Sequence, residues 1–211
     1  LHSFPTRRSS DLIAVASLVT GILSTFVWPV TVGTQSIASR RYGRQAVAPA
    51  EEKEKAAVLT GEVLESSLVA GLLAALLAIA ASFAVPAVLR MLLPDKGVVI
   101  IAYQYISLYR WSLPFLGLAV ACTGFLSAIQ KTKPIMLSNI LGNVINIGIN
   151  YVLIFGKLGF PALGIRGAAI GTVISLAVCA FILFLPLLKR ETKSLYKYFS
   201  FKGIKTEMLY S

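Results

Sequence analysis

The chain has 211 residues, of which 56% are hydrophobic and only 14% are charged. Soluble domains carry about 25% charged residues, and the shortage here, with a mean hydropathy of +0.78, excludes an ordinary water-soluble protein. The formal net charge of +11 raises the question of nucleic acid, but the basic residues cluster between long uncharged segments, so we expect a lipid bilayer and no nucleic acid as partner.

Five segments contain no Asp, Glu, Lys, Arg or His and are long enough to cross a bilayer. A helix needs about 20 apolar residues to span a hydrocarbon core of about 30 Å, whereas the buried helices of soluble cores are amphipathic and usually shorter. We therefore expect an all-α integral membrane protein, a polytopic helix bundle. Its predicted helices lie at about residues 13–39, 58–91, 101–129, 134–156 and 165–188.

The two ends of the chain differ from the part between them. Residues 1–12 resemble a translated sequencing adaptor, and we treat them as a non-native segment. Residues 191–211 mix aromatic with basic side chains, a composition that suits the anionic cytoplasmic leaflet. We predict that they form a truncated cytoplasmic interfacial linker and that the chain is a fragment.

Basic residues are distributed unevenly between the two sides of the predicted bundle. The side with more Lys and Arg faces the cytoplasm, so the first predicted helix runs from outside to inside in the plasma (inner) membrane of the cell. The richer side holds Arg40, Arg41, Arg44, Lys53, Lys55, Lys131, Lys133, Lys189, Arg190, Lys193, Lys197, Lys202 and Lys205. The poorer side holds Arg90, Lys96, Arg110, Lys157 and Arg166.

The first predicted helix contains Pro29 and, just after it, a short polar cluster. A proline inside a helix removes a backbone hydrogen bond and kinks the helix. The freed carbonyl group and the polar side chains need partners inside the membrane. We therefore expect Thr34 and Gln35 to face a cavity.

Near the outer end of the third predicted helix, several aromatic residues surround Arg110. Tyr and Trp are enriched where a membrane meets water, and an arginine there usually extends to the headgroups. We expect an interfacial aromatic belt made of Tyr103, Tyr105, Tyr109 and Trp111.

The fourth predicted helix carries four asparagines, which we call the asparagine stripe: Asn139, Asn143, Asn146 and Asn150. At about 100° per residue they share one helix face. An unsatisfied amide in hydrocarbon costs several kcal/mol, so the stripe must meet other helices or water. Hydrogen bonding between helices and a hydrated pathway or ligand site both stay open. The fifth helix opens with Gly167 and Gly171, a spacing that favours close helix contact.

Side chains suited to catalysis or metal binding are scarce. His2 is the only histidine, and Cys122 and Cys179 lie in apolar runs without metal-ligand spacing. The sequence has no buried carboxylate pair, no serine with a partner base and no phosphate-binding glycine loop. We predict that the protein is not an enzyme and has no cofactor or metal site, and that both cysteines are small packing residues.

Five segments, in the right order, are similar to the multidrug and toxic compound extrusion (MATE) family. The similarity covers about residues 13–190 and is most specific where the fifth and sixth family helices meet. The segments are 33–43 (end of the second family helix), 112–119 and 124–134 (fourth helix and the loop after it), 143–156 (fifth helix) and 164–175 (start of the sixth).

The resemblance implies twelve helices in two six-helix lobes, of which this chain is helices two to six of the first lobe. It implies a secondary antiporter that exports xenobiotics and organic cations in exchange for protons or sodium by alternating access. The implied partners are the bilayer, a small-molecule substrate and the missing second lobe. Expression of residues 13–211 alone is expected to confer no drug resistance.

The resemblance also implies a cation site. In the family, a carboxylate of the first helix combines there with polar residues of helices five and six. The fifth-helix positions match Asn146 and Asn150, and Thr172 is the plausible partner on the sixth. Some members have Asp where this chain has Asn150, and an amide can ligate a cation but cannot titrate, so the coupling ion stays open.

Two other functions stay open. A lipid-linked oligosaccharide flippase of the same broad superfamily would need a cavity rich in Arg and Lys to meet pyrophosphate, whereas the intramembrane stripe here is amide. A membrane assembly subunit without transport activity is the other alternative.

Overall fold

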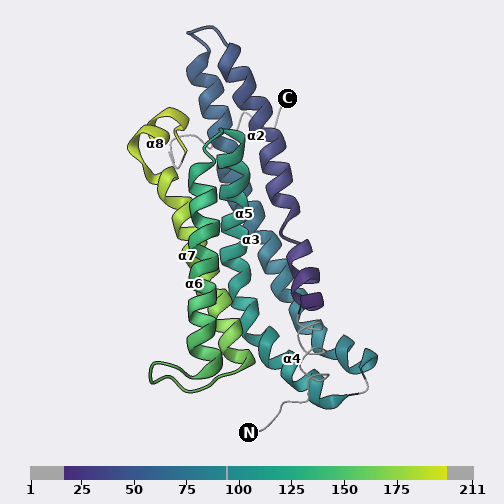
Figure 1. Cartoon of the computed structure of the whole chain (residues 1–211). Coiled ribbons are helices and arrows are strands. Elements are labelled where there is room, and N and C mark those ends of the chain that lie inside the picture. The colour runs from purple at the N-terminus through teal and green to yellow at the C-terminus, as the bar shows by residue number, and fades with distance from the viewer. Residues whose placement is uncertain (1–16, 94, 199–211) are drawn as a thin grey trace.

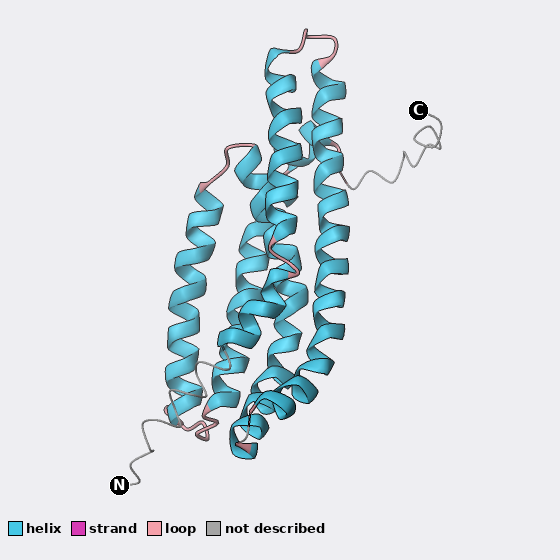
Figure 2. Ribbon diagram, turned by 90° about the vertical axis from the view of Figure 1, so that its right-hand side faces the viewer, coloured by secondary structure: helices cyan, strands magenta, loops and turns pink. Residues whose placement is uncertain are grey.

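The computed structural model describes residues 17–93 and 95–198, and over these ranges the chain is a bundle of long helices (Figures 1 and 2). The segment 1–12 and most of the predicted linker lie outside the described residues. A helical segment at residues 17–25 precedes the named helices. These are α2 (Pro29–Val47), α3 (Lys53–Leu92), α4 (Lys96–Tyr109), the short η1 (Arg110–Ser112), α5 (Leu113–Ala128), α6 (Lys133–Phe155), α7 (Ile165–Leu188) and α8 (Arg190–Tyr196).

The prediction of five membrane-crossing helices is confirmed. The segments long and apolar enough to cross a membrane are Ser17–Val47, Lys53–Leu92, Lys96–Ala128, Lys133–Phe155 and Ile165–Leu188. The first helix ends later than predicted and the second begins earlier. Both continue as helix past the membrane surface, where water solvates the charged residues that hydrocarbon would exclude. Ion pairs such as Arg41 with Glu62, 3.7 Å apart, support this projecting α2–α3 hairpin (Figure 2).

Two of the spans are interrupted. In the first, residues 26–28 form a turn and α2 begins at Pro29, so the predicted kink is confirmed. The third span is not one helix as predicted, because η1 separates α4 from α5 and Pro114 occupies the first turn of α5. Since a proline in the first turn of a helix loses no hydrogen bond, a new helix can start there in a different direction.

The centre of the bundle is α5, which packs against α2, α3 and α7. Small residues allow this. A Cβ on Gly71 of α3 or on Gly117 of α5 would overlap the backbone of the other glycine, and a Cβ on Gly124 would lie 2.6 Å from the carbonyl oxygen of Thr31. By contrast, α6 packs mainly on α7 and buries only Ser138 and Gly142.

The short helix α8 closes the end of the bundle at which α7 finishes (Figure 1). Tyr196 and Tyr198 are 3% and 2% exposed, and their rings lie 5.7 and 6.5 Å from that of Phe125 in edge-to-face geometry. Lys131 donates a 3.0 Å hydrogen bond to the hydroxyl of Thr192. The described part of the predicted linker therefore packs on the bundle, and its contact with a lipid surface stays a prediction.

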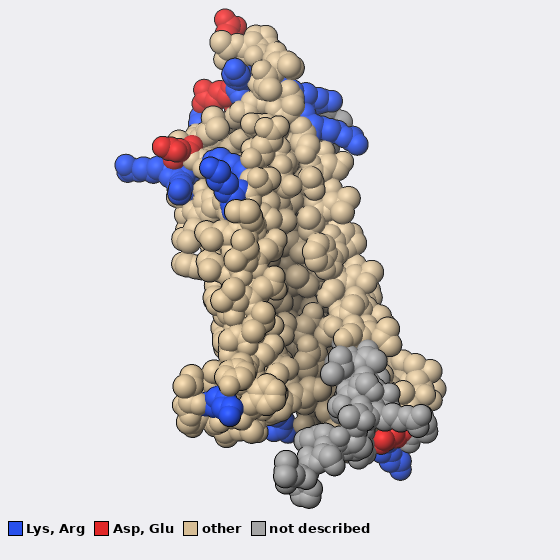
Figure 3. Space-filling model, in the orientation of Figure 1, with Lys and Arg blue, Asp and Glu red and all other residues tan. Residues whose placement is uncertain are grey.

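Charge divides between the two ends of the bundle. Figure 3 shows Lys and Arg gathered at the end that holds the α2–α3 hairpin, with few at the opposite end and almost none between. The uncharged middle is the surface that a bilayer would cover.

Candidate functional site

The asparagine stripe divides into two halves. Asn146 and Asn150 are half-buried where α6 meets α7, whereas Asn139 and Asn143 are exposed. Nδ2 of Asn150 donates to Oδ1 of Asn146 at 3.0 Å, and Nδ2 of Asn146 donates to Oγ of Ser175 at 3.1 Å. Because residues four apart lie one above the other on a helix, two amides of α6 form one hydrogen-bonded chain with a hydroxyl of α7.

The hydrogen-bonded chain continues along α7. Ser175 donates to the carbonyl oxygen of Thr172 at 3.0 Å, and the hydroxyl of Thr172 donates to the carbonyl oxygen of Ala168, also at 3.0 Å. A hydroxyl that donates to backbone keeps lone pairs with which to accept. The side chain of Tyr105, on α4, lies near that of Thr172. Asn146, Asn150, Thr172 and Ser175 thus lie together at the contact of α6 with α7, and we call them the asparagine cluster; their role as a cation site stays a prediction.

One atom of this cluster has no hydrogen-bond partner. Oδ1 of Asn150 is buried and accepts no hydrogen bond from any described residue. It faces Gly171, where a Cβ would overlap it. A buried polar atom without a partner costs about 1–3 kcal/mol, and such atoms often mark a functional site or an unseen ligand. The amide oxygen is available to a cation or to a hydrogen-bond donor.

The cluster is neutral. The uncharged runs 134–156 and 167–188 contain no Asp, Glu or His, so these parts of α6 and α7 supply oxygen atoms but no carboxylate or imidazole. The nearest cation along α7 is Arg166, whose Nε donates to Oε1 of Gln104 at 3.3 Å. The arrangement can ligate a cation through carbonyl and hydroxyl oxygens.

Thr34 and Gln35 do not belong to the asparagine cluster. Thr34 is buried against Gly124 of α5 and donates a 2.6 Å hydrogen bond to the carbonyl oxygen of Val30, which is the position of a packing residue between α2 and α5. Gln35 is exposed. The structure brings neither into the hydrogen bonds of the asparagine cluster, and their place in a cavity stays a prediction.

Three residues in or beside the cluster were not predicted from the sequence. Ser175 lies three positions after Thr172 on the same face of α7, so spacing alone could have identified it. Gly171 was interpreted only as a packing residue. Tyr105 and Tyr109 were assigned to an interfacial belt, but Tyr105 lies near Thr172 and Tyr109 is buried. Nothing in the sequence distinguishes them from Tyr103 and Trp111, which are exposed.

A family model described as MatE matches residues 6–152. The chain belongs to the MatE family. It is therefore a multi-pass membrane protein, and the resemblance detected in the sequence is confirmed.

Among curated MATE relatives, the chain is 34% identical over 161 residues to "Probable multidrug resistance protein YoeA" of Bacillus subtilis (strain 168). The match covers 76% of this chain and 34% of the relative. A second relative, "Probable multidrug resistance protein NorM" of Thermotoga maritima, is 46% identical over 66 residues, which are 31% of this chain and 14% of the relative. This chain thus spans about a third of YoeA.

Two solved structures share the fold. One is described as a crystal structure of MATE in the bent conformation, with a TM-score of 0.68 and 22% identity over 87% of this chain and 38% of that one. The other is an inward-facing conformation of a multidrug resistance MATE family transporter, with a TM-score of 0.66 and 23% identity over 87% of this chain and 39% of that one.

Proposed function

We propose that this chain is part of a secondary antiporter that exports xenobiotics and organic cations in exchange for protons or sodium. Two curated relatives carry the name multidrug resistance protein, which supports export over lipid-linked oligosaccharide flipping or a role in assembly. The chain covers 34% of YoeA, so transport is a property of a complete two-lobe protein in the plasma (inner) membrane. The lobes rock about a central cavity to expose it to each side in turn.

The observation that carries the proposal is the unpartnered amide oxygen of Asn150. Together with Oδ1 of Asn146 and the hydroxyl of Thr172 it provides oxygen ligands on two adjoining membrane helices. Oxygen atoms that replace a hydration shell are how membrane proteins hold alkali cations. A flippase would need basic residues to meet pyrophosphate, whereas these side chains are amides and a hydroxyl.

The exposed half of the asparagine stripe lines the substrate path and does not bind the coupling ion. Asn139 and Asn143 lie on the side of α6 that α7 leaves open. They line the path along which a substrate moves between the lobes, and Gln35 of α2 lines it as well. Polar side chains there keep the path hydrated.

The neutral cluster limits how the coupling ion works. Because an amide cannot titrate, a proton would have to be carried by a carboxylate that another helix supplies, as the family resemblance implies for the first helix. Sodium could be bound by the cluster directly. Efflux driven by an imposed sodium gradient, compared with efflux driven by an imposed proton gradient, separates the two.

The test is the substitution Asn150→Leu in the complete transporter, produced in a bacterium that lacks its own efflux pumps. Loss of a ligand to a charged group, worth about 1.5–3 kcal/mol, is expected to slow efflux of a cationic dye about tenfold. Val144→Leu, on an exposed face of the same helix, is the control and should leave efflux unchanged. Normal expression of Asn150→Leu with unchanged efflux would rule out this site.

A further inference from the structure

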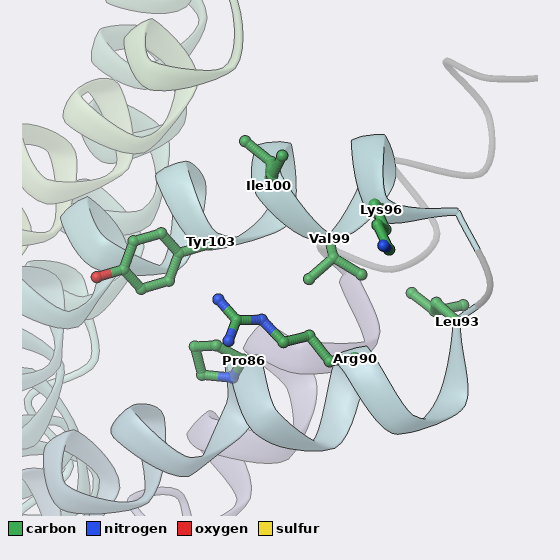
Figure 4. A pocket seen from close by; sticks show the side chains of 7 residues that line it. All are labelled: Pro86, Arg90, Leu93, Lys96, Val99, Ile100 and Tyr103. Carbon is green, nitrogen blue, oxygen red and sulfur yellow. The ribbon is translucent and has the colours of Figure 1, made fainter.

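A slot with both basic and apolar walls lies between the end of α3 and α4, away from the asparagine cluster. Its volume is about 540 Å³. Figure 4 shows it from close by. The lining residues are Pro86, Arg90, Leu93, Lys96, Val99, Ile100 and Tyr103.

The lining of the slot differs between its entrance and its interior. Arg90 is in the last turn of α3 and Lys96 in the first turn of α4, so both begin at the membrane surface. At 1.5 Å per residue, Tyr103 lies about 10 Å farther along α4 than Lys96. Between them Val99 and Ile100 form an apolar wall. The slot therefore has the ammonium group of Lys96 at its entrance and apolar walls farther in.

The two cations of the slot are not paired with an acid of the described residues. Among the described residues, neither Arg90 nor Lys96 makes a hydrogen bond or an ion pair. The guanidinium of Arg90 extends back past Pro86 towards Tyr103 (Figure 4), as expected because helical side chains tilt towards the N-terminus. An unpaired charge directed towards hydrocarbon is costly, so this guanidinium needs water or an anion.

A third cation and one acid adjoin the slot. The guanidinium of Arg110 lies 4.1 Å from the ring centroid of Phe83, one turn from Pro86, and its buried Nε has no hydrogen-bond partner among the described residues. Asp95 caps α4 by accepting from the backbone nitrogen of Gly97 at 2.7 Å. Among the described residues, three basic side chains against one carboxylate leave this corner positive, at the end of the bundle that is otherwise poor in Lys and Arg.

We propose that the slot binds one anionic phospholipid of the outer leaflet. The phosphate lies between the ammonium group of Lys96 and the guanidinium of Arg90, where charge-assisted hydrogen bonds are strong, and an acyl chain lies along Val99 and Ile100. Basic pockets between membrane helices recognise lipid head groups in this way. The site is separate from the asparagine cluster and does not depend on transport.

The experiment uses the 211-residue chain in detergent and measures bound lipid by native mass spectrometry during titration with phosphatidylglycerol or phosphatidylcholine. Phosphatidylglycerol is expected to bind more tightly. The double substitution Arg90→Gln with Lys96→Gln should weaken its binding about tenfold. Lys157→Gln removes a basic residue at the same end, outside the slot, and should change the affinity less than about twofold.

Three results would overturn the proposal. Phosphatidylglycerol could bind the double variant as it binds the original chain, Lys157→Gln could weaken binding equally, or inorganic phosphate alone could compete as strongly as the lipid. If the double variant does not fold, Lys96→Glu replaces it, because an acid in the first turn of a helix suits the helix dipole. That variant should also lose the preference for phosphatidylglycerol, and a retained preference would contradict the site.

Discussion

At the level of single residues, the candidate site depends on a missing side chain as much as on its amides. Gly171 leaves the space that Oδ1 of Asn150 occupies, and one turn earlier a Cβ on Gly167 would lie 2.8 Å from the backbone of Leu153. The two glycines therefore set the distance between α6 and α7. That distance brings Asn146 within hydrogen-bonding reach of Ser175.

We expect Gly171→Ala to destabilise the chain by about 1–3 kcal/mol, the usual cost of overpacking. The new Cβ must displace the amide of Asn150 and so disturb its hydrogen bond to Asn146. Gly148→Ala is the matched control, because no atom lies within 4 Å of a Cβ there, and it should not destabilise the chain. The measurement is thermal unfolding in detergent, followed by circular dichroism. Equal unfolding temperatures for the two variants would contradict this account.

The sequence predicts the α6 side of the site better than the α7 side. Four asparagines in one membrane helix stand out because each amide there must be satisfied. Ser175 does not stand out, since a hydroxyl can bond to its own helix backbone. The contact of Tyr105 with Thr172 joins residues 67 positions apart, and only the packing of α4 on α7 brings them together.

At the level of elements, the five spans are predictable because a charge in hydrocarbon is expensive, so uncharged runs mark the bilayer crossings. The ends of α2 and α3 were not predictable from this rule, since the helices continue into water where charges are tolerated. The break at η1 was not predicted either. Pro114 is visible in the sequence, but a proline can equally kink a continuous helix or begin a new one.

Alkaline pH should weaken the packing of α8 on the bundle. Burial, more than nearby ionisable groups, raises the pKa of Tyr196 and of Tyr198 to about 12, from an ordinary value of 10.0. A raised tyrosine pKa means that docking favours the neutral phenol. Its contribution is complete below pH 10 and is lost as pH rises towards 12.

Ultraviolet titration of tyrosinate tests this. Tyr196 and Tyr198 should ionise late in the folded chain, and Tyr198→Phe should remove one late-ionising phenol. In denaturant all should ionise near the ordinary pKa. Ionisation of both Tyr196 and Tyr198 near pH 10 in the folded chain would show that α8 is not held against Phe125.

At the level of the whole molecule, the unequal charge of the two ends predicts how the bundle is oriented across the membrane. The α2–α3 hairpin, the α5–α6 turn and α8 share the basic end, while the α3–α4 and α6–α7 connections share the other (Figures 1 and 3). From the positive-inside rule we predict that the basic end faces the cytoplasm. The same direction places the slot of Arg90 and Lys96 in the outer leaflet.

Cysteine labelling in intact cells tests this orientation. In a background of Cys122→Ala and Cys179→Ala, single cysteines replace Glu51, between α2 and α3, or Lys157, between α6 and α7; both positions are exposed. A membrane-impermeant maleimide should label Lys157→Cys from outside and Glu51→Cys only after the cells are permeabilised, because three spans separate the two positions. The reverse pattern would invert the bundle and move the lipid slot to the inner leaflet. Labelling of both positions from outside would contradict the number of spans between them.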